Sequence, residues 1–158
     1  MARSRVAAMA SIGGERTVEI DAPIERCYAI AADIDNAPSW QGSLRSVEVL
    51  ERDAEGRAVL VNTRSDAKVK EIRTRLRFSF EPPASIRWVQ EKGDMSALEG
   101  AWQLEDLGDD RTRATYALAA DPGRVLGMLL RGPAQDRIRD FLLGDAAEGL
   151  KRRAEHGG

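Results

Sequence analysis

Few residues of this sequence could carry acid–base, nucleophilic or metal chemistry. It contains one cysteine, Cys27, and one histidine, His156, in 158 residues. A single cysteine excludes an intrachain disulfide and a metal site built from cysteines. His156 lies near the C-terminus, in a tail that we expect to be flexible, so we expect neither histidine catalysis nor a multi-histidine metal centre in the folded part. Cys27 lies on the apolar side of a predicted helix without a core histidine to activate it, so we predict that it is structural.

A short acidic stretch after this helix offers a pattern with metal-ligand chemistry. Asp33, Asp35 and Asn36 supply oxygen atoms that a divalent cation could bind. The same residue types also cap helices and initiate turns, because their short side chains hydrogen-bond to nearby backbone groups. The turn interpretation is favoured, since the stretch is dense in capping and helix-breaking residues and reaches Pro38. We therefore predict no metal ligand and no catalytic residue.

Aromatic side chains recur on the apolar faces of three predicted strands. Trp88, Trp102 and Tyr116 occupy alternating segments that we expect to be neighbours in a sheet. They either form an aromatic wall against a flat ligand, with the indole N–H groups and the tyrosine hydroxyl as hydrogen-bond donors, or pack in an ordinary core. Two polar residues, Thr74 and Gln90, share these faces. They either meet a ligand or a trapped water, or lie near strand ends and contact solvent.

Two further features have alternative interpretations. Gly100 lies between Leu98 and Trp102, where it either makes room for a ligand or, as we favour, marks a bulge that lets the sheet curl. The segment Val125–Leu130, which contains Met128, concentrates large apolar residues between two pairs of glycine and proline. It is either a lid, or a patch that transiently contacts a membrane or a carrier protein, or an ordinary connection packed on the end of the domain.

Hydrophobic periodicity defines the elements that must position these residues. Alternation predicts strands over 16–21, 43–52, 57–64, 70–81, 86–91, 98–105 and 112–118. Helical spacing predicts a helix over 23–32, a very short helix that ends at Trp40, and a long helix over 134–153. The strand over 70–81 alternates most clearly and places Leu76 and Phe78 on its apolar face. The faces of the second and third strands are less defined, and a slip of one residue would turn Arg64 or Asp66 inward.

This order of elements predicts an α+β fold. A seven-stranded curved antiparallel sheet would wrap around the long C-terminal helix, with two short helices after the first strand closing one end. A helix of about 18–20 residues is roughly 27–30 Å long, which is enough to lie across the apolar face of the sheet. Side chains do not fill the widest part of such a grip, so we expect an apolar cavity, with Ile138 and Leu142 of the helix facing it.

Composition agrees with a globular protein of balanced charge. Hydrophobic residues make up 42% and charged residues 32%, and 24 Lys and Arg against 26 Asp and Glu give a formal net charge of −2. A dedicated nucleic-acid-binding protein usually has a basic excess, so no nucleic-acid partner is expected. No apolar run approaches the ~18–20 residues that cross a bilayer. The expected location is the cytoplasm.

One domain over residues 15–153 accounts for the pattern, with flexible ends over 1–14 and 154–158. A targeting role for the N-terminal end is the weaker alternative. Arg3 and Arg5 precede an apolar run that is short for a signal peptide and ends at a glycine pair. The sequence leaves the oligomeric state open.

Three segments resemble a known superfamily. They are TVEIDAPIERCYAIAADIDNAPSW (17–40), LEGAWQLEDLGDDRTRATYAL (98–118) and AAEGLKRRAE (146–155). With the order of elements, they resemble the START-like (SRPBCC) helix-grip superfamily, and within it the polyketide cyclase/dehydrase and coenzyme-Q-binding START branch. The resemblance covers about residues 15–153 and implies a hydrophobic-ligand cavity, closed near Trp40. Members include lipid and quinone carriers and polyketide aromatase/cyclases.

Two main function classes follow. The first is binding or carriage of a small hydrophobic or amphipathic ligand, namely a lipid, an isoprenoid quinone or a polyketide-like aromatic, without a cofactor. The second is a polyketide aromatase/cyclase or dehydratase, which needs acids or bases inside the cavity. Charged residues lie mainly on outward faces, which favours the first. A third hypothesis is a stress or interaction protein with a vestigial cavity. The predicted ligand-binding residues are Trp40, Thr74, Leu76, Phe78, Trp88, Gln90, Trp102, Tyr116, Met128, Ile138 and Leu142.

Overall fold

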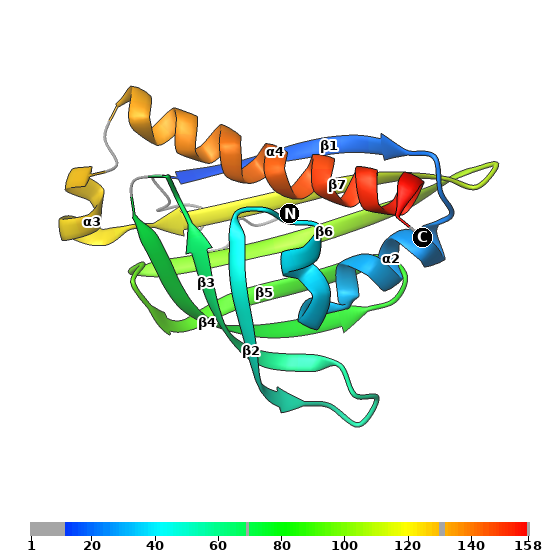
Figure 1. Cartoon of the computed structure of the whole chain (residues 1–158), viewed down its shortest axis with the longest axis horizontal. Coiled ribbons are helices and arrows are strands. Elements are labelled where there is room, and N and C mark those ends of the chain that lie inside the picture. The colour runs from blue at the N-terminus through cyan, green and yellow to red at the C-terminus, as the bar shows by residue number, and fades with distance from the viewer. Residues whose placement is uncertain (1–11, 69, 130–131, 158) are drawn as a thin grey trace, which may run out of the picture.

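The computed structural model describes residues 12–68, 70–129 and 132–157, which form the α+β fold expected from the sequence (Figure 1). Seven strands make one antiparallel sheet, and two short helices follow the first strand. The elements are β1 (Ile12–Ile20), α2 (Ile24–Ala32), the 3-10 helix η1 (Ile34–Ser39), β2 (Leu44–Arg52), β3 (Ala58–Asp66), β4 (Glu71–Glu81), β5 (Ser85–Gly93), β6 (Ala97–Gly108), β7 (Arg111–Asp121), α3 (Gly123–Leu129) and α4 (Pro133–His156).

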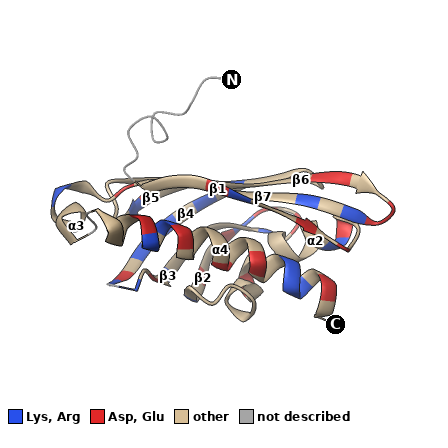
Figure 2. Cartoon of the chain, turned by 90° about the horizontal axis from the view of Figure 1, so that it is seen from above, with Lys and Arg blue, Asp and Glu red and all other residues tan. Residues whose placement is uncertain are grey.

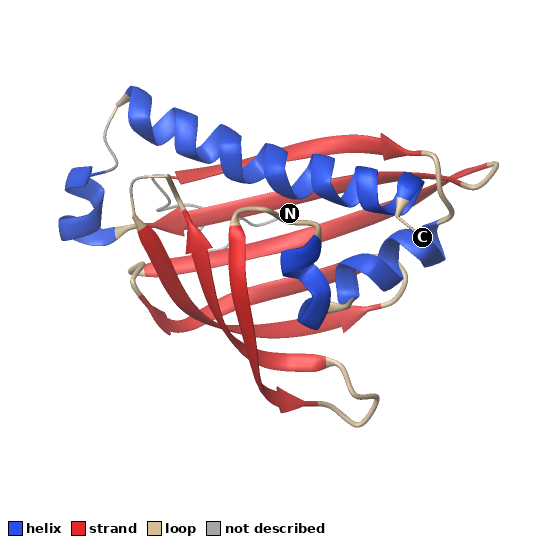
Figure 3. Ribbon diagram, in the orientation of Figure 1, coloured by secondary structure: helices blue, strands red, loops and turns tan. Residues whose placement is uncertain are grey.

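The sheet is a meander with its first strand added at the far edge. The strand order is β1-β7-β6-β5-β4-β3-β2, so β1 pairs with β7. Strands β2 and β3 run steeply across the direction of β6 and β7, so the sheet is strongly curved (Figure 3). Right-handed twist accumulates along such a meander. The curvature therefore lets one sheet enclose a helix from two sides.

The helix α4 covers the concave side of the sheet along β1 and β7 (Figure 1). With 24 residues and a rise of about 1.5 Å per residue, it is about 36 Å long. Its buried side includes Ile138, Leu143 and Leu150. In Figure 2, α2, α3 and α4 all lie on the same side of the layer formed by β1, β7, β6 and β5. The helices therefore cover one face of the sheet and leave the other to solvent.

Buried hydrogen bonds fix α2 against the sheet. The Tyr28 hydroxyl donates to the carbonyl oxygen of Ser85 on β5 at 3.0 Å. The Thr112 hydroxyl of β7 donates to the carbonyl oxygen of Ala22, just before α2, at 2.8 Å. Each of these bonds satisfies a polar group that would otherwise be buried without a partner. Together they hold α2 at one end of the sheet.

The buried apolar residues form two clusters. The larger one packs α2, η1 and the second half of α4 on the central strands, and it contains Trp40, Trp88, Trp102 and Tyr116. The smaller one lies at the other end of α4 and contains Leu126 of α3 and Ile138 of α4. Leu98 packs against both clusters. The two clusters therefore adjoin each other at Leu98 along the inner face of the sheet.

The ends of the fold reach slightly beyond the expected bounds of 15–153. Strand β1 begins at Ile12, and α4 continues to His156, with Ala154 buried. The side chain of Arg26 on α2 holds this end of α4, because its Nε donates to the carbonyl oxygen of Ala154 at 2.7 Å. An arginine at a helix C-terminus satisfies carbonyl groups that the helix itself leaves open. The expectation for residues 1–11 lies outside the described residues.

Candidate ligand-binding cavity

A cavity of about 130 Å³ lies between the concave face of the sheet and α4. Strands β3 to β7 form most of its wall, and η1 closes one end with Ile34 and Ala37. The helix α4 contributes Ile138 and Leu142 on the opposite side. A concave space with an apolar wall and a few polar groups is the usual form of a small-molecule site.

Five aromatic rings follow one another along the wall. The ring centroids of Trp40 and Trp102 are 6.3 Å apart, and those of Trp102 and Tyr116 are 4.8 Å apart. The series continues from Tyr116 to Trp88 and from Trp88 to Phe78, each at 5.6 Å. Tilted ring pairs at such distances attract each other beyond their burial of area. All five rings also line the cavity, so residues that pack against one another could also contact a ligand there.

Gly100 does not mark the bulge favoured from the sequence. It pairs in regular register with Trp88 of β5 and with Leu118 of β7. The indole of Trp88 occupies the space beside Gly100 in which a side chain would lie. The missing side chain thus makes room for an indole and not for a ligand or a bend.

The helix α4 comes close to Trp40 because residue 149 is a glycine. A Cβ atom on Gly149 would lie 2.5 Å from the carbonyl oxygen of Trp40 and 3.3 Å from its Cε3. Any side chain here would push α4 away from the end of η1. Gly149 therefore determines how tightly the helix closes this end of the cavity.

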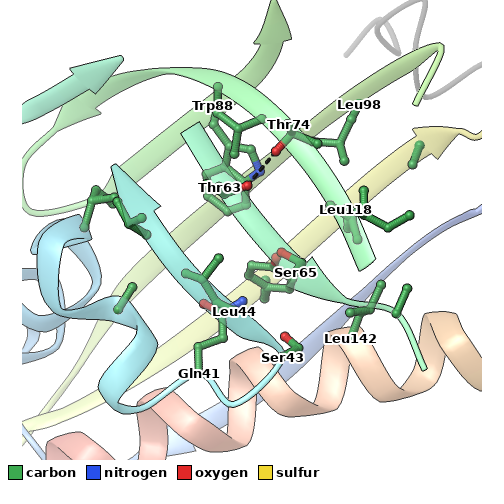
Figure 4. Close-up of a pocket in the computed structure, with 18 of the residues that line it drawn as sticks. Gln41, Ser43, Leu44, Thr63, Ser65, Thr74, Trp88, Leu98, Leu118 and Leu142 are labelled. Carbon is green, nitrogen blue, oxygen red and sulfur yellow. Dashed lines mark hydrogen bonds between the residues drawn. The ribbon is translucent and has the colours of Figure 1, made fainter. Parts of the chain in front are cut away.

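A pair of hydroxyl groups lies on the β3–β4 side of the cavity. The Oγ1 atoms of Thr63 and Thr74 are 2.6 Å apart and buried (Figure 4). One hydroxyl donates to the other, and the second keeps a proton for which the described residues provide no acceptor. Both residues line the cavity. The pair can therefore donate a hydrogen bond to an oxygen atom of a ligand.

Tyr116 carries the other hydroxyl group of the wall. Burial raises the pKa of Tyr116 well above its ordinary value, a hydrogen bond with the Gln41 side chain lowers it in part, and the carboxylate of Asp145 raises it further. The same Asp145 accepts a hydrogen bond from the backbone N–H of Ser43 at 2.8 Å. Figure 4 shows Gln41 and Ser43 on the α4 side, across the cavity from Thr63 and Thr74. The phenol therefore stays neutral and acts as a hydrogen-bonding group.

The cavity wall holds no charged side chain among the described residues, and Tyr116 is its only titratable group. Arg64 and Asp66, whose direction the sequence left open, lie on the other side of β3. Arg64 Nε bonds to Glu71 Oε1 at 3.0 Å, and Asp66 Oδ2 accepts from Arg45 at 2.9 Å. General acid–base catalysis needs a group with a pKa near the working pH. The described wall offers no such group.

Residues 20–143 match a protein family described as polyketide cyclase/dehydrase and lipid transport. The chain belongs to this family. No curated protein gives a significant match. The chain also has the START-like helix-grip fold, as the solved structures show.

One similar structure is a START superfamily protein from Mycobacterium smegmatis, with a TM-score of 0.78, 19% identity, and coverage of 90% of this chain and 96% of that one. TTHA0849 from Thermus thermophilus has a TM-score of 0.77 and 23% identity, with coverage of 90% and 96%. The Zhui aromatase/cyclase from Streptomyces sp. R1128 has a TM-score of 0.69 and 20% identity, with coverage of 92% and 97%. At these identities the likeness shows the fold alone.

In this member of the polyketide cyclase/dehydrase and lipid transport family, most residues predicted as ligand-binding line one cavity. They are Trp40, Thr74, Leu76, Phe78, Trp88, Trp102, Tyr116, Ile138 and Leu142. Gln90 and Met128 lie outside the lining. The Gln90 amide Nε2 donates to the carbonyl oxygen of Met95 at 2.9 Å, which draws the side chain toward the β5–β6 turn.

Met128 is 61% exposed because α3 turns only Leu126 into the core. Val125 and Leu129 are also exposed, at 79% and 56%. The described part of this apolar segment therefore buries one large side chain, Leu126, and exposes three, Val125, Met128 and Leu129. Leu130, which the prediction included, lies outside the described residues.

Sequence reasoning missed four polar lining residues, namely Gln41, Ser43, Thr63 and Ser65. Gln41 and Ser43 belong to the loop between η1 and β2, which has no periodicity that reveals a face. Thr63 and Ser65 alternate with Asn62 and Arg64 in β3. That pattern contains polar residues on both faces, so only the pairing with β4 shows which side is buried.

The residues that the sequence offered as a reactive thiol or as metal ligands make structural contacts. Cys27 is buried, its thiol faces the carbonyl oxygen of Ala22 at 3.8 Å, and burial raises its pKa. Asn36 donates to Asp33 at 2.7 Å, and Asp35 binds Arg52 of β2 at 2.7 Å. In the described part of the chain, no group of three His, Cys, Asp or Glu residues could hold a metal ion. No described helix is long and apolar enough to cross a membrane.

Proposed function

We propose that this family member binds a compact, uncharged and largely apolar molecule in the cavity between the sheet and α4. The observation that carries the proposal is an aromatic and aliphatic wall in which Tyr116 is the only titratable side chain among the described lining residues. Burial of the ligand's apolar surface would supply affinity at roughly 25 cal/mol per Å². A charged ligand would have no partner in this wall, so it would lose its hydration without compensation.

The cavity volume favours a single ring. An apolar cavity of about 150 Å³ holds benzene, whereas pockets for drug-sized ligands have roughly 300–1,000 Å³. This cavity, at about 130 Å³, belongs to the first class. A lipid, an isoprenoid quinone or a folded polyketide is larger. Carriage of any of these would require α4 or the loop after η1 to move outward.

The polar groups favour a ligand with an oxygen acceptor. The Thr63–Thr74 pair has a free proton on one side of the cavity, and the Tyr116 hydroxyl lies in the wall of the same space. A carbonyl or ether oxygen directed at the threonine pair would receive a hydrogen bond, which is worth about 0.5–1.5 kcal/mol. A substituted aromatic ketone has this shape and polarity.

An aromatase/cyclase or dehydratase is the second candidate. It is motivated by the family match over residues 20–143, which supports either role. Such an enzyme must move protons on a folded polyketide, and Tyr116 would have to do so with a pKa that burial raises. The described wall supplies hydrogen-bond donors more readily than bases, so binding is the better-supported role.

Tryptophan fluorescence and calorimetry test the proposal with three probes: acetophenone, palmitate and a short-chain ubiquinone. Trp88 and Trp102 line the cavity and should report binding directly. Leu142→Trp would fill the cavity, and Leu50→Trp is the matched control because Leu50 is 39% exposed on β2. We expect acetophenone to bind the wild type and Leu50→Trp, and to bind Leu142→Trp at least about tenfold more weakly.

Each result decides between the candidates. Failure of all three probes, or equal affinity for both variants, would overturn the proposal. Tight binding of palmitate or ubiquinone with no binding of acetophenone would replace it with lipid or quinone carriage. Conversion of a linear poly-β-ketone thioester into an aromatic product would establish the second candidate.

A further inference from the structure

The outer face of the sheet carries a polar groove on the opposite side of β3 and β4 from the cavity. It is an open hollow of about 430 Å³, lined from β2, β3, β4, the end of β5 and the turn that follows β5. Four of its side chains are cationic, namely Arg64, Arg73, Arg75 and Lys92, and two are anionic, Glu48 and Asp94. Figure 2 shows the blue of Lys and Arg along β4. The groove is therefore positive in a protein whose formal net charge is −2.

Two cross-strand pairs in this groove bring like charges together. Arg64 of β3 pairs with Arg73 of β4, and Arg75 of β4 pairs with Lys92 of β5. Glu71 compensates the first pair, because its Oε1 lies 3.0 Å from Arg64 Nε and 3.2 Å from Arg73 Nε. Like charges directly opposite on one sheet face repel. The first pair is thus bridged by a carboxylate of the chain itself.

The second pair has no such carboxylate. Among the described residues, neither Arg75 nor Lys92 forms an ion pair. The carboxylates nearest in the groove have other partners, since Asp94 accepts from the backbone N–H of Arg73 at 2.8 Å and Glu48 accepts from Asn62 at 2.8 Å. Among the described residues, therefore, no carboxylate forms an ion pair that would offset the repulsion between Arg75 and Lys92.

Arg75 is nevertheless held in a fixed orientation. Its Nε donates to Oδ1 of Asn62 at 3.0 Å, and the Asn62 amide is itself fixed by Glu48. The side chain is partly buried, and a register shift between Arg75 and Leu76 distorts the pairing of β4 with β5 at this point. These contacts use Nε and leave the Nη groups available. A guanidinium with its stem fixed in this way is preorganised to bind an oxyanion.

We propose that Arg75 and Lys92 form a binding site for a phosphoryl group. A phosphate carries about −1.5 to −2 charges near neutral pH and accepts hydrogen bonds on three oxygens. It would bridge Arg75 and Lys92 as Glu71 bridges Arg64 and Arg73. Its source is either a free phosphate or phosphate monoester, or the headgroup of an anionic lipid. The site does not depend on the proposed function of the cavity, because it uses the other face of the sheet.

Thermal unfolding at constant ionic strength tests the site, with inorganic phosphate against chloride as the probe. Matched ionic strength is required because salt alone screens the repulsion. The variants are Arg75→Gln and Lys92→Gln, and the control is Arg87→Gln. Arg87 is exposed on the same face of β5, opposite Ser79 and Ala101, so the control removes one charge outside the groove.

We expect phosphate to raise the Tm of the wild type and of Arg87→Gln, with an apparent affinity at least about tenfold weaker in Arg75→Gln and Lys92→Gln. Without phosphate, Lys92→Gln should have a higher Tm than the wild type, because the repulsion is removed. Cosedimentation with phosphatidylcholine vesicles, with and without phosphatidate, separates the two sources. The site would bind a lipid headgroup if the wild type cosedimented only with vesicles that contain phosphatidate, if Lys92→Gln lost this binding, and if free phosphate did not change the Tm. The proposal would be overturned if phosphate raised the Tm of all variants equally, or if neither free phosphate nor phosphatidate vesicles bound the wild type.

Discussion

The indole of Trp88 on β5 lies against Gly100, its direct partner on β6. A Cβ atom on Gly100 would overlap Cε2, Cζ2 and Nε1 of the indole. The ring is held on its other sides, since Phe78 and Tyr116 each lie at a centroid distance of 5.6 Å. Trp88 is therefore held by Gly100, Phe78 and Tyr116, and its remaining side faces the cavity.

Gly100→Ala should destabilise the fold. An added methyl group must displace Trp88 and its aromatic neighbours, and such overpacking costs about 1–3 kcal/mol. Chemical denaturation measures the loss. The control is Gly127→Ala on α3, where a Cβ would meet only Pro122, at 3.7 Å. There we expect little change or a small gain, because alanine favours helices. Equal stability of Gly100→Ala and the wild type would show that Trp88 adapts freely.

Substitutions of Thr63 and Thr74 should have strongly coupled effects on the free energy of unfolding, because the two hydroxyl groups bond to each other. Thr63→Val or Thr74→Val alone leaves one buried hydroxyl without its partner, which should cost about 1–3 kcal/mol. The double variant removes both hydroxyls and should be nearly as stable as the wild type. A double-mutant cycle by denaturation measures the coupling, and additive losses would contradict it. The double variant should also bind a ketone more weakly but leave the affinity for a hydrocarbon of the same shape unchanged.

Ligand affinity should not depend on pH near neutrality. Burial raises the pKa of Tyr116, so its hydroxyl stays protonated from about pH 6 to about pH 9. Calorimetry over this range should give one dissociation constant. Tyr116→Phe should weaken binding of a ligand with an oxygen acceptor by about 1 kcal/mol if the hydroxyl contacts it, again without a pH dependence. A bell-shaped profile would reveal a titrating group and favour the enzymatic alternative.

Protonation of Glu155 should account for part of the fall in the free energy of unfolding at acidic pH. Its pKa is lowered, first by the backbone N–H of Asp21, which donates at 2.8 Å, and then by Lys151 Nζ at 2.8 Å. A carboxylate with a lowered pKa stabilises the folded state above its ordinary pKa, and this contribution is lost as the pH falls through the folded-state value. Glu155→Gln should therefore lower the free energy of unfolding by about 1 kcal/mol near neutral pH and have a smaller effect in acid.

The matched control for this prediction is Glu148→Gln on the same helix. Glu148 meets Arg16 only at 3.9 Å, with both side chains nearly half exposed. Such a surface pair contributes about 0–1 kcal/mol. Urea titrations of both variants across the acidic range make the comparison. A loss for Glu155→Gln that is the same at every pH would contradict the role of its ionised form.

The sequence predicted the fold because the alternation in its central strands is regular. Leu76, Trp88, Trp102 and Tyr116 each lie two residues from apolar neighbours, so a single choice of face places all of them on the concave side. The stripe on α4 predicted Ile138 and Leu142 in the same way. These positions follow from local periodicity and one rule, that an apolar face must be covered.

The sequence did not predict positions where periodicity fails. The register shift beside Leu76 and the bond from Gln90 to Met95 turn Gln90 away from the cavity. The seven residues of α3 have room for only one deeply buried apolar side chain, so Met128 points outward. Gln41 lies in a loop whose direction depends on Asp145, far away in the chain.

The sequence by itself determined the fold class, the faces of the central strands and the scarcity of histidine and cysteine, with one residue of each. Only the tertiary structure decided the volume of the cavity, the hydroxyl pair in its wall and the meeting of Arg75 with Lys92. The physical reason is that local patterns fix which side of an element is apolar. Cavity volumes and side-chain contacts depend on the distances between packed elements. Close contacts between residues far apart in the sequence, such as Trp88 with Gly100 and Trp40 with Gly149, set these distances.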